Sequence, residues 1–573
     1  MTLSGNLKKT RRIFPYVFGV CLLAVLIPYF DSLWGDFVFD DVPLVQRDRF
    51  YVQEDNPLKC WTRDFWKENM KQGLYRPFTL FSYWVNAKIS GIHSPAFRIG
   101  NLIFHFLVTI LVFNFAVRLR FGHWVAMFAA VLFAVHPIHT EAVIPAFGRG
   151  ELLCAIFLLC ALIIHSHIGK NKLLCIVSGL SFLFACWSKE HALAFLPLCV
   201  LLDLYLRTQE KSSDSTGIKN FARSMAPVYL LYVCIAAVFF ASRYFALGTL
   251  IPSKNNFNPA IDNPIALCQF PLNVITALKV QGLSLFKFFW PAVLSHDYSY
   301  AQLPPSVSVF DWKSWLTVVL FLGVPGLICV AFRKLKFKIV FLLAAYAVCI
   351  MPAGNFIIMA GTIFGERLQY IPSIWLCMFS ALAVSLLFRK FSAKTVLVLS
   401  AAIIIAASVR TYERGKDWDN QMSLATAGVR SAPNSVKTWN NLAIQLGEYS
   451  DKEKDPKEQA NKYKEAVLAC DRAISIYPPC LNSYANRGIY YSLLGYYDEA
   501  EKDFRKVISL YPKDSHVNYA LGALLADQGR LDEAKALWEK LIKINPDDQV
   551  LRKSYEKLCA DIKEKQAGSE KTD

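Results

Sequence analysis

The stretch that decides the fold is WGDFVFDDVPLVQRDR, residues 34–49, in which two adjacent acids, Asp40 and Asp41, follow closely after an apolar run. That run, residues 13–30, is almost as long as the roughly 20 apolar residues that cross a bilayer as a helix. The acidic pair is therefore predicted to lie just outside a membrane, at the start of a loop that extends to residue 97.

The composition divides the chain into two parts that face different solvents. Hydrophobic residues make up 54% of its 573 residues, which is too high a share for a soluble enzyme, and they are concentrated before residue 410. Residues 411–573 are polar and rich in helix-forming residues. Candidate membrane segments lie at 13–30, 98–117, 124–144, 151–167, 173–187, 190–206, 226–245, 273–290, 312–332, 339–358, 367–388 and 395–409.

The net charge of +17 does not indicate nucleic-acid binding, because Lys and Arg are concentrated in the short links between apolar segments. Such basic links are typical of cytoplasmic loops. They follow the N-terminal basic residues at 8–12, and they lie at 118–123, 168–172, 207–224, 332–338 and 389–394. A cytoplasmic N-terminus and an extracytoplasmic C-terminus satisfy this rule.

The segment 273–290 is the exception among the apolar runs. If it crossed the membrane, the basic link 332–338 would lie outside, and Lys279 and Lys287 would enter the bilayer at a cost of about 2.5–3.5 kcal/mol each. We therefore expect an amphipathic helix at the interface. The remaining segments predict an all-α membrane domain over residues 1–410 with about eleven spans.

The polar part of the chain repeats with a period of 34 residues. The repeat relates Pro478, Pro512 and Pro546, then Gly488 and Gly522, then Ala500 and Ala534. This period is typical of tetratricopeptide repeats, which stack helix pairs into a solenoid.

About three repeats are predicted over 437–550, after a linker at 411–436, and the first repeat is interrupted by EYSDKEKDPKEQ. Residues 551–573 are expected to end the last helix and to form a disordered tail. The concave face of such a solenoid suits an extended peptide.

Asp40 and Asp41 are the candidate catalytic groups. A carboxylate outside the membrane can act as a general base, taking the proton of an acceptor hydroxyl that attacks a sugar carbon. Phosphate on a lipid carrier then leaves with cationic or hydrogen-bonding help. The simpler interpretation is that the pair stabilises a turn, since Asp is common there.

Other ionisable residues are predicted to lie on the same outer side. Such groups are costly at membrane depth and usually mark sites or pathways. Three of the arginines are candidates for holding a lipid phosphate through paired hydrogen bonds. The residues on this side include Arg76, His136, His139, Glu141, Arg149, Lys189, Glu190, Asp297, Glu366 and Arg367.

Each of these residues has a plainer alternative. His136 and His139 could hold a metal, although Pro137 disturbs the helix between them and no third ligand is obvious. Lys189 and Glu190 could be a pair that snorkels to the interface. Glu366 could serve only to neutralise Arg367. We predict no metal cofactor.

In this order, the chain carries FVFDD, YRPFT, HPIHTEAV with GRGELL, SKE, LSHDYS, ERLQYIPS and RTYERGKDW, followed by the repeats. With these motifs, it resembles the transmembrane and tetratricopeptide-repeat (TMTC-type) proteins of the GT-C glycosyltransferase superfamily. The resemblance covers roughly residues 30 to 550. The chain departs from the animal members in having only about three repeats, which puts a cadherin-like acceptor in doubt.

The resemblance implies an O-mannosyltransferase-like enzyme that uses a polyprenyl-phosphate sugar and acts on a protein Ser or Thr hydroxyl on the extracytoplasmic side. It implies a GT-C-like fold for the membrane domain at 1–410 and assigns catalysis to Asp40 and Asp41. It also implies that the ten other ionisable residues of these motifs, from Arg76 to Arg367, form the donor site. It also implies a multi-pass protein of the endoplasmic reticulum or of a bacterial inner membrane. Two alternatives stay open: a non-enzymatic, membrane-anchored repeat scaffold, and a transporter.

Overall fold

The computed structural model describes residues 3–66, 73–168, 171, 173–209, 215–250, 258–356, 359–388, 390–544 and 546–569. Across these residues every regular element is a helix. The chain forms two compact units, of which the first comprises Met1–Ser299 and Leu303–Ala427, and the second comprises Tyr300–Gln302 and Gly428–Asp573.

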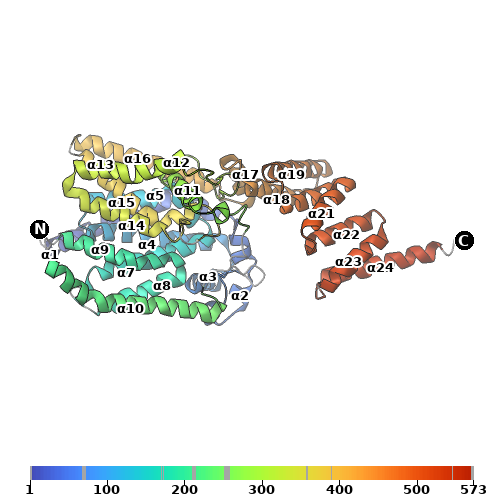
Figure 1. Cartoon of the computed structure of the whole chain (residues 1–573), viewed down its shortest axis with the longest axis horizontal. Coiled ribbons are helices and arrows are strands. Elements are labelled where there is room, and N and C mark those ends of the chain that lie inside the picture. Colours follow the sequence, from blue (N-terminus) through green and yellow to red (C-terminus); the bar gives the residue numbers. More distant parts are fainter. Residues whose placement is uncertain are drawn as a thin grey trace. The chain divides into compact units, whose positions relative to one another are not determined.

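The first unit is a bundle of long helices that run side by side (Figure 1). Its long helices are α1 (Leu3–Tyr29), α4 (Ser94–Arg118), α5 (His123–Val135), α7 (Arg149–His165), α8 (Leu174–Ser188), α9 (Phe195–Gln209), α10 (Ser215–Leu247), α14 (Lys336–Ile350), α15 (Tyr370–Leu387) and α16 (Ala393–Lys416). α12 (Trp312–Val318) and α13 (Val324–Ala331) are joined through the π-helical turn η11 (Val319–Gly323).

Shorter elements lie between these helices. They are η1 (Asp31–Trp34), η2 (Val42–Gln46), α2 (Phe50–Gln53), η3 (Pro57–Thr62), α3 (Pro77–Ser90), η5 (Pro137–His139), α6 (Thr140–Val143), η6 (Ala146–Gly148), η8 (Glu190–Ala194), η10 (Pro264–Leu267), α11 (Leu272–Phe289), η12 (Arg333–Leu335) and η13 (Glu366–Gln369). The predicted outer loop at 31–97 therefore contains two helices and several single turns.

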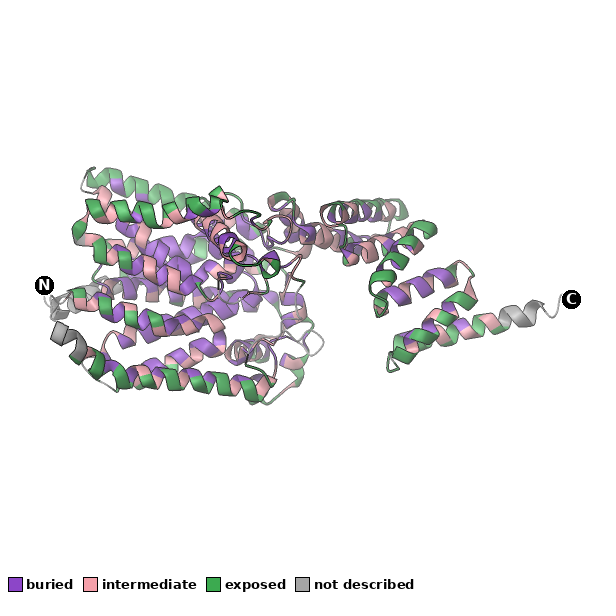
Figure 2. Ribbon diagram, in the orientation of Figure 1, coloured by how far each residue is buried: buried purple, intermediate pink, exposed green. Residues whose placement is uncertain are grey.

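Several bundle helices expose apolar side chains along their outer faces, which is the pattern expected of lipid contact. α10, α13 and α16 carry exposed residues along much of their length (Figure 2). Within the described residues, eight helices are long and apolar enough to cross a membrane, or nine if the bent α5–α6 pair is one span. α11 is one of the eight, so its interfacial placement and the count of eleven stay predictions.

The predicted span 124–144 is broken. α5 ends at Val135, and the axis turns by 50° before α6. Pro137 lacks a backbone N–H, and it holds His136 in an extended conformation (φ −74°, ψ 125°) that ends the helix. The break places Glu141 on a short helix of its own.

The basic links come together at one end of the bundle. Arg118 donates to the Ser166 side chain, Arg120 donates to the carbonyl of Gln209, and Lys338 donates to the carbonyl of Arg120. Residues 169, 170, 172, 210–214 and 389, which include parts of the predicted links, lie outside the described residues. Because successive helices alternate in direction, the predicted site residues lie at the end of the bundle opposite the basic links.

The second unit contains the predicted repeats. Three helix pairs follow one another: α18 (Val436–Ser450) with α19 (Pro456–Ile476), α20 (Leu481–Leu493) with α21 (Tyr497–Leu510), and α22 (Ser515–Asp527) with α23 (Leu531–Ile544). Gly488 and Gly522 let aromatic rings approach the first helix of a pair: a Cβ at Gly522 would lie 2.0 Å from the Trp538 indole nitrogen.

Helices extend into three segments for which the sequence predicted no helix. The linker at 411–436 is largely helical, because α16 continues to Lys416 and α17 (Gln421–Ser431) follows it. The insertion in the first repeat is divided: residues 448–450 end α18, 451–455 connect the helices, and 456–459 begin α19. α24 (Gln549–Ser569) continues through most of the tail that we expected to be disordered, and residues 570–573 lie outside the described residues.

Candidate active site

Asp41 anchors the loop that carries the acidic pair. Its side chain is buried, and its two carboxylate oxygens accept hydrogen bonds from the backbone N–H groups of Ala146 (3.0 Å) and Phe147 (2.7 Å). These residues form η6, which lies between the broken third span and α7. The pair is therefore tied directly to the GRGELL motif region, far away in the sequence.

Two effects oppose each other at the Asp41 carboxyl. Burial raises its pKa to about 7, whereas the two amide hydrogen bonds and the charge of Arg98 lower that pKa. The carboxyl therefore titrates near neutral pH. A group that already accepts two backbone hydrogen bonds in a buried position is a poor candidate for the base that meets an acceptor.

Phe39 holds the loop on the other side of Asp40. It has a positive φ of 54°, which is costly for an aromatic residue. Its N–H donates to the Gln421 side chain (3.1 Å), and its ring packs edge-on against His296 and Phe147. The backbone on both sides of Asp40 is thus fixed by residues from distant parts of the chain.

Asp40 itself remains accessible. Its side chain is 26% exposed, and one oxygen lies 3.8 Å from the Arg367 guanidinium. Arg367 in turn pairs with the buried Glu141 (2.7 Å), which also accepts the Arg367 backbone N–H (3.0 Å). The guanidinium lies over the Phe147 ring. Glu141 therefore orients Arg367, and Arg367 faces Asp40.

Two further acid–base pairs adjoin this group. Lys189 donates to the buried Glu151. Arg76 Nε donates to one oxygen of Glu190 (3.1 Å), and Arg76 Nη2 lies 3.0 Å from the same oxygen. Arg76 and Arg367 are both charged neighbours of Lys189, which connects the two pairs to the Asp40 group. The cluster combines Glu141 on α6 and Glu151 on α7 with side chains from the segments that follow α1, α8 and α14 and from the residue before α3.

A second network surrounds Glu366. Its carboxylate accepts hydrogen bonds from the Ser295 N–H (2.7 Å) and the Tyr298 hydroxyl, and it lies 3.7 Å from the Arg414 guanidinium. Asp297 accepts hydrogen bonds from the backbone and the hydroxyl of Ser299. These contacts join the LSHDYS loop to η13 and to the end of α16, so they shape the site's wall.

The two histidines are buried and fully engaged. His136 shares a hydrogen bond with the Phe288 carbonyl (3.0 Å) and stacks on the Phe288 ring. His139 makes hydrogen bonds with the Phe133 carbonyl and the Ser373 hydroxyl. Such contacts fit a packing role at the helix break. Among the residues described, no three His, Cys, Asp or Glu side chains could together hold a metal ion.

Arg149 does not join the Asp40 cluster. Its guanidinium is buried and donates to the Asn101 and Asn86 side chains and to the backbone carbonyls of Phe97 and Ser82. The ring of Tyr83 lies against it as well. It joins α3, α4 and α7, and protein acceptors occupy four of its five N–H donors.

Three residues that contribute to the cluster or its walls were not among the predicted site residues: Glu151, Arg414 and Gln421. Glu151 lies in the quoted GRGELL motif and Arg414 in RTYERGKDW, so the motifs contained a signal for both. Nothing local in the sequence marks Gln421, because its contact with Phe39 joins residues 382 positions apart.

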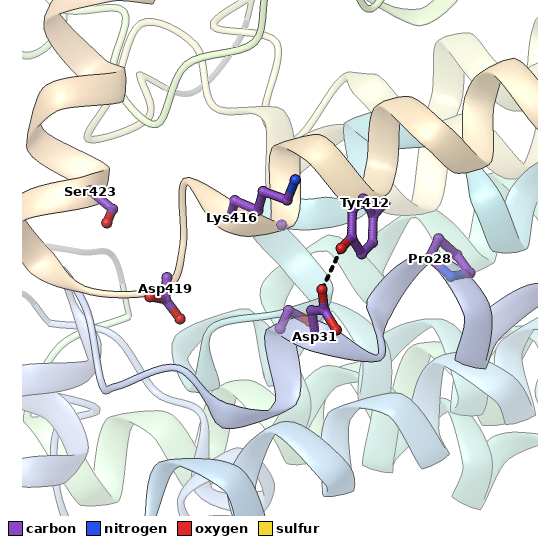
Figure 3. Close-up of a pocket in the computed structure, with 8 residues that line it drawn as sticks. Pro28, Asp31, Tyr412, Lys416, Asp419 and Ser423 are labelled. Atoms are coloured by element: carbon purple, nitrogen blue, oxygen red, sulfur yellow. Dashed lines mark hydrogen bonds between the residues drawn. The ribbon is translucent and has the colours of Figure 1, made fainter.

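A cavity of about 370 Å³ opens near the ends of α1 and α16. Asp31, Lys416 and Asp419 line it, and Tyr412 donates a hydrogen bond to Asp31 (Figure 3). Asp419 also accepts the N–H of Asp36 (2.7 Å). The cavity therefore borders the segment that holds the loop of the acidic pair, and no residue of that pair lines it.

Comparison with known proteins gives two kinds of match. The tetratricopeptide-repeat family model matches residues 494–558. Protein O-mannosyl-transferase F38B6.6 of Caenorhabditis elegans is 29% identical over 437 residues, which cover 74% of this chain and 59% of that protein. Human protein O-mannosyl-transferase TMTC3 is 26% identical over 501 residues, covering 83% of this chain and 53% of that protein.

Among solved structures, the Archaeoglobus fulgidus oligosaccharyltransferase with a tethered acceptor peptide covers 79% of this chain and 58% of its own, at 14% identity and a TM-score of 0.39. That score is too low to establish a common fold. This chain spans between half and three-fifths of the length of the curated relatives above. The sequence relatives confirm the resemblance: over most of its length, the chain is related to the TMTC-type protein O-mannosyl-transferases.

Proposed function

We propose that the protein is an integral membrane glycosyltransferase. It moves a sugar, mannose, from a polyprenyl-phosphate donor to the hydroxyl of a protein Ser or Thr on the extracytoplasmic side. The carrying observation is a partly exposed carboxylate, Asp40, on a backbone fixed on both sides, beside the Arg367–Glu141 pair. The relatives named O-mannosyl-transferases support the same activity.

In this mechanism, Asp40 accepts the proton of the acceptor hydroxyl as the hydroxyl oxygen attacks the anomeric carbon. The bond from that carbon to the phosphate oxygen breaks, and both of its electrons stay with the phosphate. A single displacement of this kind inverts the configuration at the anomeric carbon. Asp41 is a positioning residue, because its oxygens are occupied by Ala146 and Phe147.

Arg367 has two tasks in this arrangement. Its positive charge faces the Asp40 carboxylate at 3.8 Å. Because it is bound to Glu141 through both its guanidinium and its backbone N–H, it needs no reorganisation as the reaction proceeds. The repeat unit is proposed to bind the acceptor polypeptide, as tetratricopeptide solenoids can bind extended segments.

The direct test is transfer by the purified protein in lipid nanodiscs. Polyprenyl-phosphate mannose and a Ser/Thr-rich peptide are supplied, and the glycopeptide is measured by mass spectrometry. Asp40→Asn should abolish transfer, and Asp31→Asn is the matched control because Asp31 lines the separate cavity.

The competing function is a membrane-anchored repeat scaffold, which the separate compact repeat unit favours. A scaffold retains partner binding and full biological activity in the Asp40→Asn protein and shows no transfer with any lipid-phosphate sugar. A glycosyltransferase loses both transfer and biological activity with that substitution. The two functions therefore predict opposite results for the same variant.

A further inference from the structure

The cations of the candidate site are already neutralised. Arg76 is paired with Glu190 (3.0 Å), Lys189 with Glu151, and Arg367 with Glu141 (2.7 Å). A donor phosphate that bound any of them would have to compete with a carboxylate fixed in place. The phosphate is more strongly attracted to a cation whose charge is not yet compensated.

Arg243 is such a cation, and it was not among the predicted site residues. It lies near the end of α10 with 2% of its surface exposed. One guanidinium nitrogen donates to the Gly73 carbonyl (2.5 Å), and Nε has no hydrogen-bond partner among the residues that the structure describes. No carboxylate of the described residues forms an ion pair with it. A buried, unsatisfied guanidinium is costly unless a ligand uses it.

Arg243 adjoins the predicted donor site. Glu190, Asp64 and Arg76 are its charged neighbours. Asp64 accepts hydrogen bonds from the backbone N–H groups of Trp66 and Gly73. The side chains of Arg76 and Glu190 are 16% and 25% exposed. The pair beside Arg243 is therefore partly exposed, and Arg243 forms no ion pair with an acid of the described residues.

We propose that Arg243 binds the phosphate of the lipid-linked donor, with Arg76 beside it. This proposal rests on the proposed function and adds the residue that holds the leaving group. The donor phosphodiester carries one negative charge, and breaking the bond to the anomeric carbon leaves a phosphate monoester that carries up to two. Arg243 therefore stabilises a charge that grows during transfer, while the acceptor proton goes to Asp40.

The test measures binding of polyprenyl phosphate to the full-length protein in nanodiscs by native mass spectrometry. The unphosphorylated polyprenol and inorganic phosphate are the two comparison ligands. Arg243→Gln is expected to weaken polyprenyl phosphate binding about 10- to 100-fold, the range of a charge-assisted hydrogen bond to an anion. Arg243→Lys should weaken it several-fold, because an ammonium lacks the paired donors.

Arg223→Gln is the matched control. It removes the same charge from an exposed position on the same helix, roughly 30 Å away at 1.5 Å per residue, and it should leave binding unchanged. If Arg243→Gln does not yield folded protein, Arg243→Lys decides: weakened binding supports the proposal and wild-type binding overturns it.

Two failures are distinguishable. If the wild type binds polyprenyl phosphate and Arg243→Gln binds it equally well, the role of Arg243 is wrong and the proposed function stands. If the wild type neither binds polyprenyl phosphate nor transfers sugar, the proposed function is wrong, and the role of Arg243 falls with it. Equal binding of polyprenol and polyprenyl phosphate by the wild type also overturns the role of Arg243.

Discussion

Asp40 and Asp41 are adjacent, yet the structure gives them different tasks, and a pair of substitutions separates these tasks. Asp40→Asn removes a base while keeping the shape of the side chain. Asp41→Ala removes both acceptors that hold Ala146 and Phe147. We expect the first variant to lose turnover and keep its stability, and the second to lose stability.

The magnitude for Asp41→Ala follows from its two hydrogen bonds. Two buried N–H groups would lose their acceptor, at about 1–3 kcal/mol each, so the cost is about 2–6 kcal/mol. The wild-type carboxylate is itself unfavourable to bury, as its raised pKa of about 7 indicates. We therefore expect Asp41→Ala to lower the free energy of unfolding by about 2 kcal/mol at pH 8, the lower end of this range.

Asp40→Asn should behave differently. The side chain is 26% exposed and lies 3.8 Å from Arg367, so losing this partly solvated pair changes stability by less than about 1 kcal/mol. Loss of a general base lowers turnover about 10²- to 10⁴-fold. The donor KM should change little, because the base contacts the acceptor rather than the donor.

The assay combines initial transfer rates with urea or thermal unfolding of the same nanodisc preparations. The roles are refuted if Asp41→Ala unfolds like the wild type while Asp40→Asn is destabilised. They are also refuted if Asp40→Asn keeps more than a tenth of wild-type turnover. Parallel loss of activity and stability in both variants would show that the pair acts only as a structural anchor.

Three further outcomes are expected. The folded-state pKa of Asp41 lies above its usual value near 4, so its contribution to the free energy of unfolding is fully present below about pH 4 and is lost as pH rises through about 7. The difference in unfolding free energy between the wild type and Asp41→Ala should therefore narrow from pH 5 to pH 8. Arg149→Gln leaves buried acceptors on Asn101 and Asn86 unpaired, and it should cost more than about 2 kcal/mol in thermal unfolding without a specific change in the donor KM. Gly522→Ala places a methyl group against Trp538, and it should destabilise the repeat unit by about 1–3 kcal/mol, read from the Trp538 fluorescence transition.

The sequence predicted the architecture well where a period or a length sets it. The 34-residue spacing of Pro478 and Pro512 predicted helix pairs, and the structure has them. The apolar segments predicted the bundle helices, and Pro137 marked the place where the third span breaks. Each of these signals is local, because backbone chemistry or the thickness of a bilayer determines it.

The site was only partly predictable. The alternating direction of successive helices tells at which end of the bundle a residue lies, but it does not tell toward which neighbouring helix the side chain points. Glu141, Arg149 and His139 all lie at the same end. Glu141 faces Arg367, Arg149 points between α3 and α4, and His139 points to Ser373. Pairwise contacts between distant segments decide among these directions, and a single sequence contains no record of them.

Charge compensation explains how so many ionisable residues can occupy one end of a membrane bundle. Each buried acid that is matched by a cation avoids most of the cost of an isolated charge, and the pairs are already in place before a ligand arrives. The exceptions then carry information about function. Asp40 is the carboxylate of the pair that stays exposed, and Arg243 is buried with an unsatisfied nitrogen. A reaction that takes up a proton at one point and leaves negative charge at another needs one group of each kind.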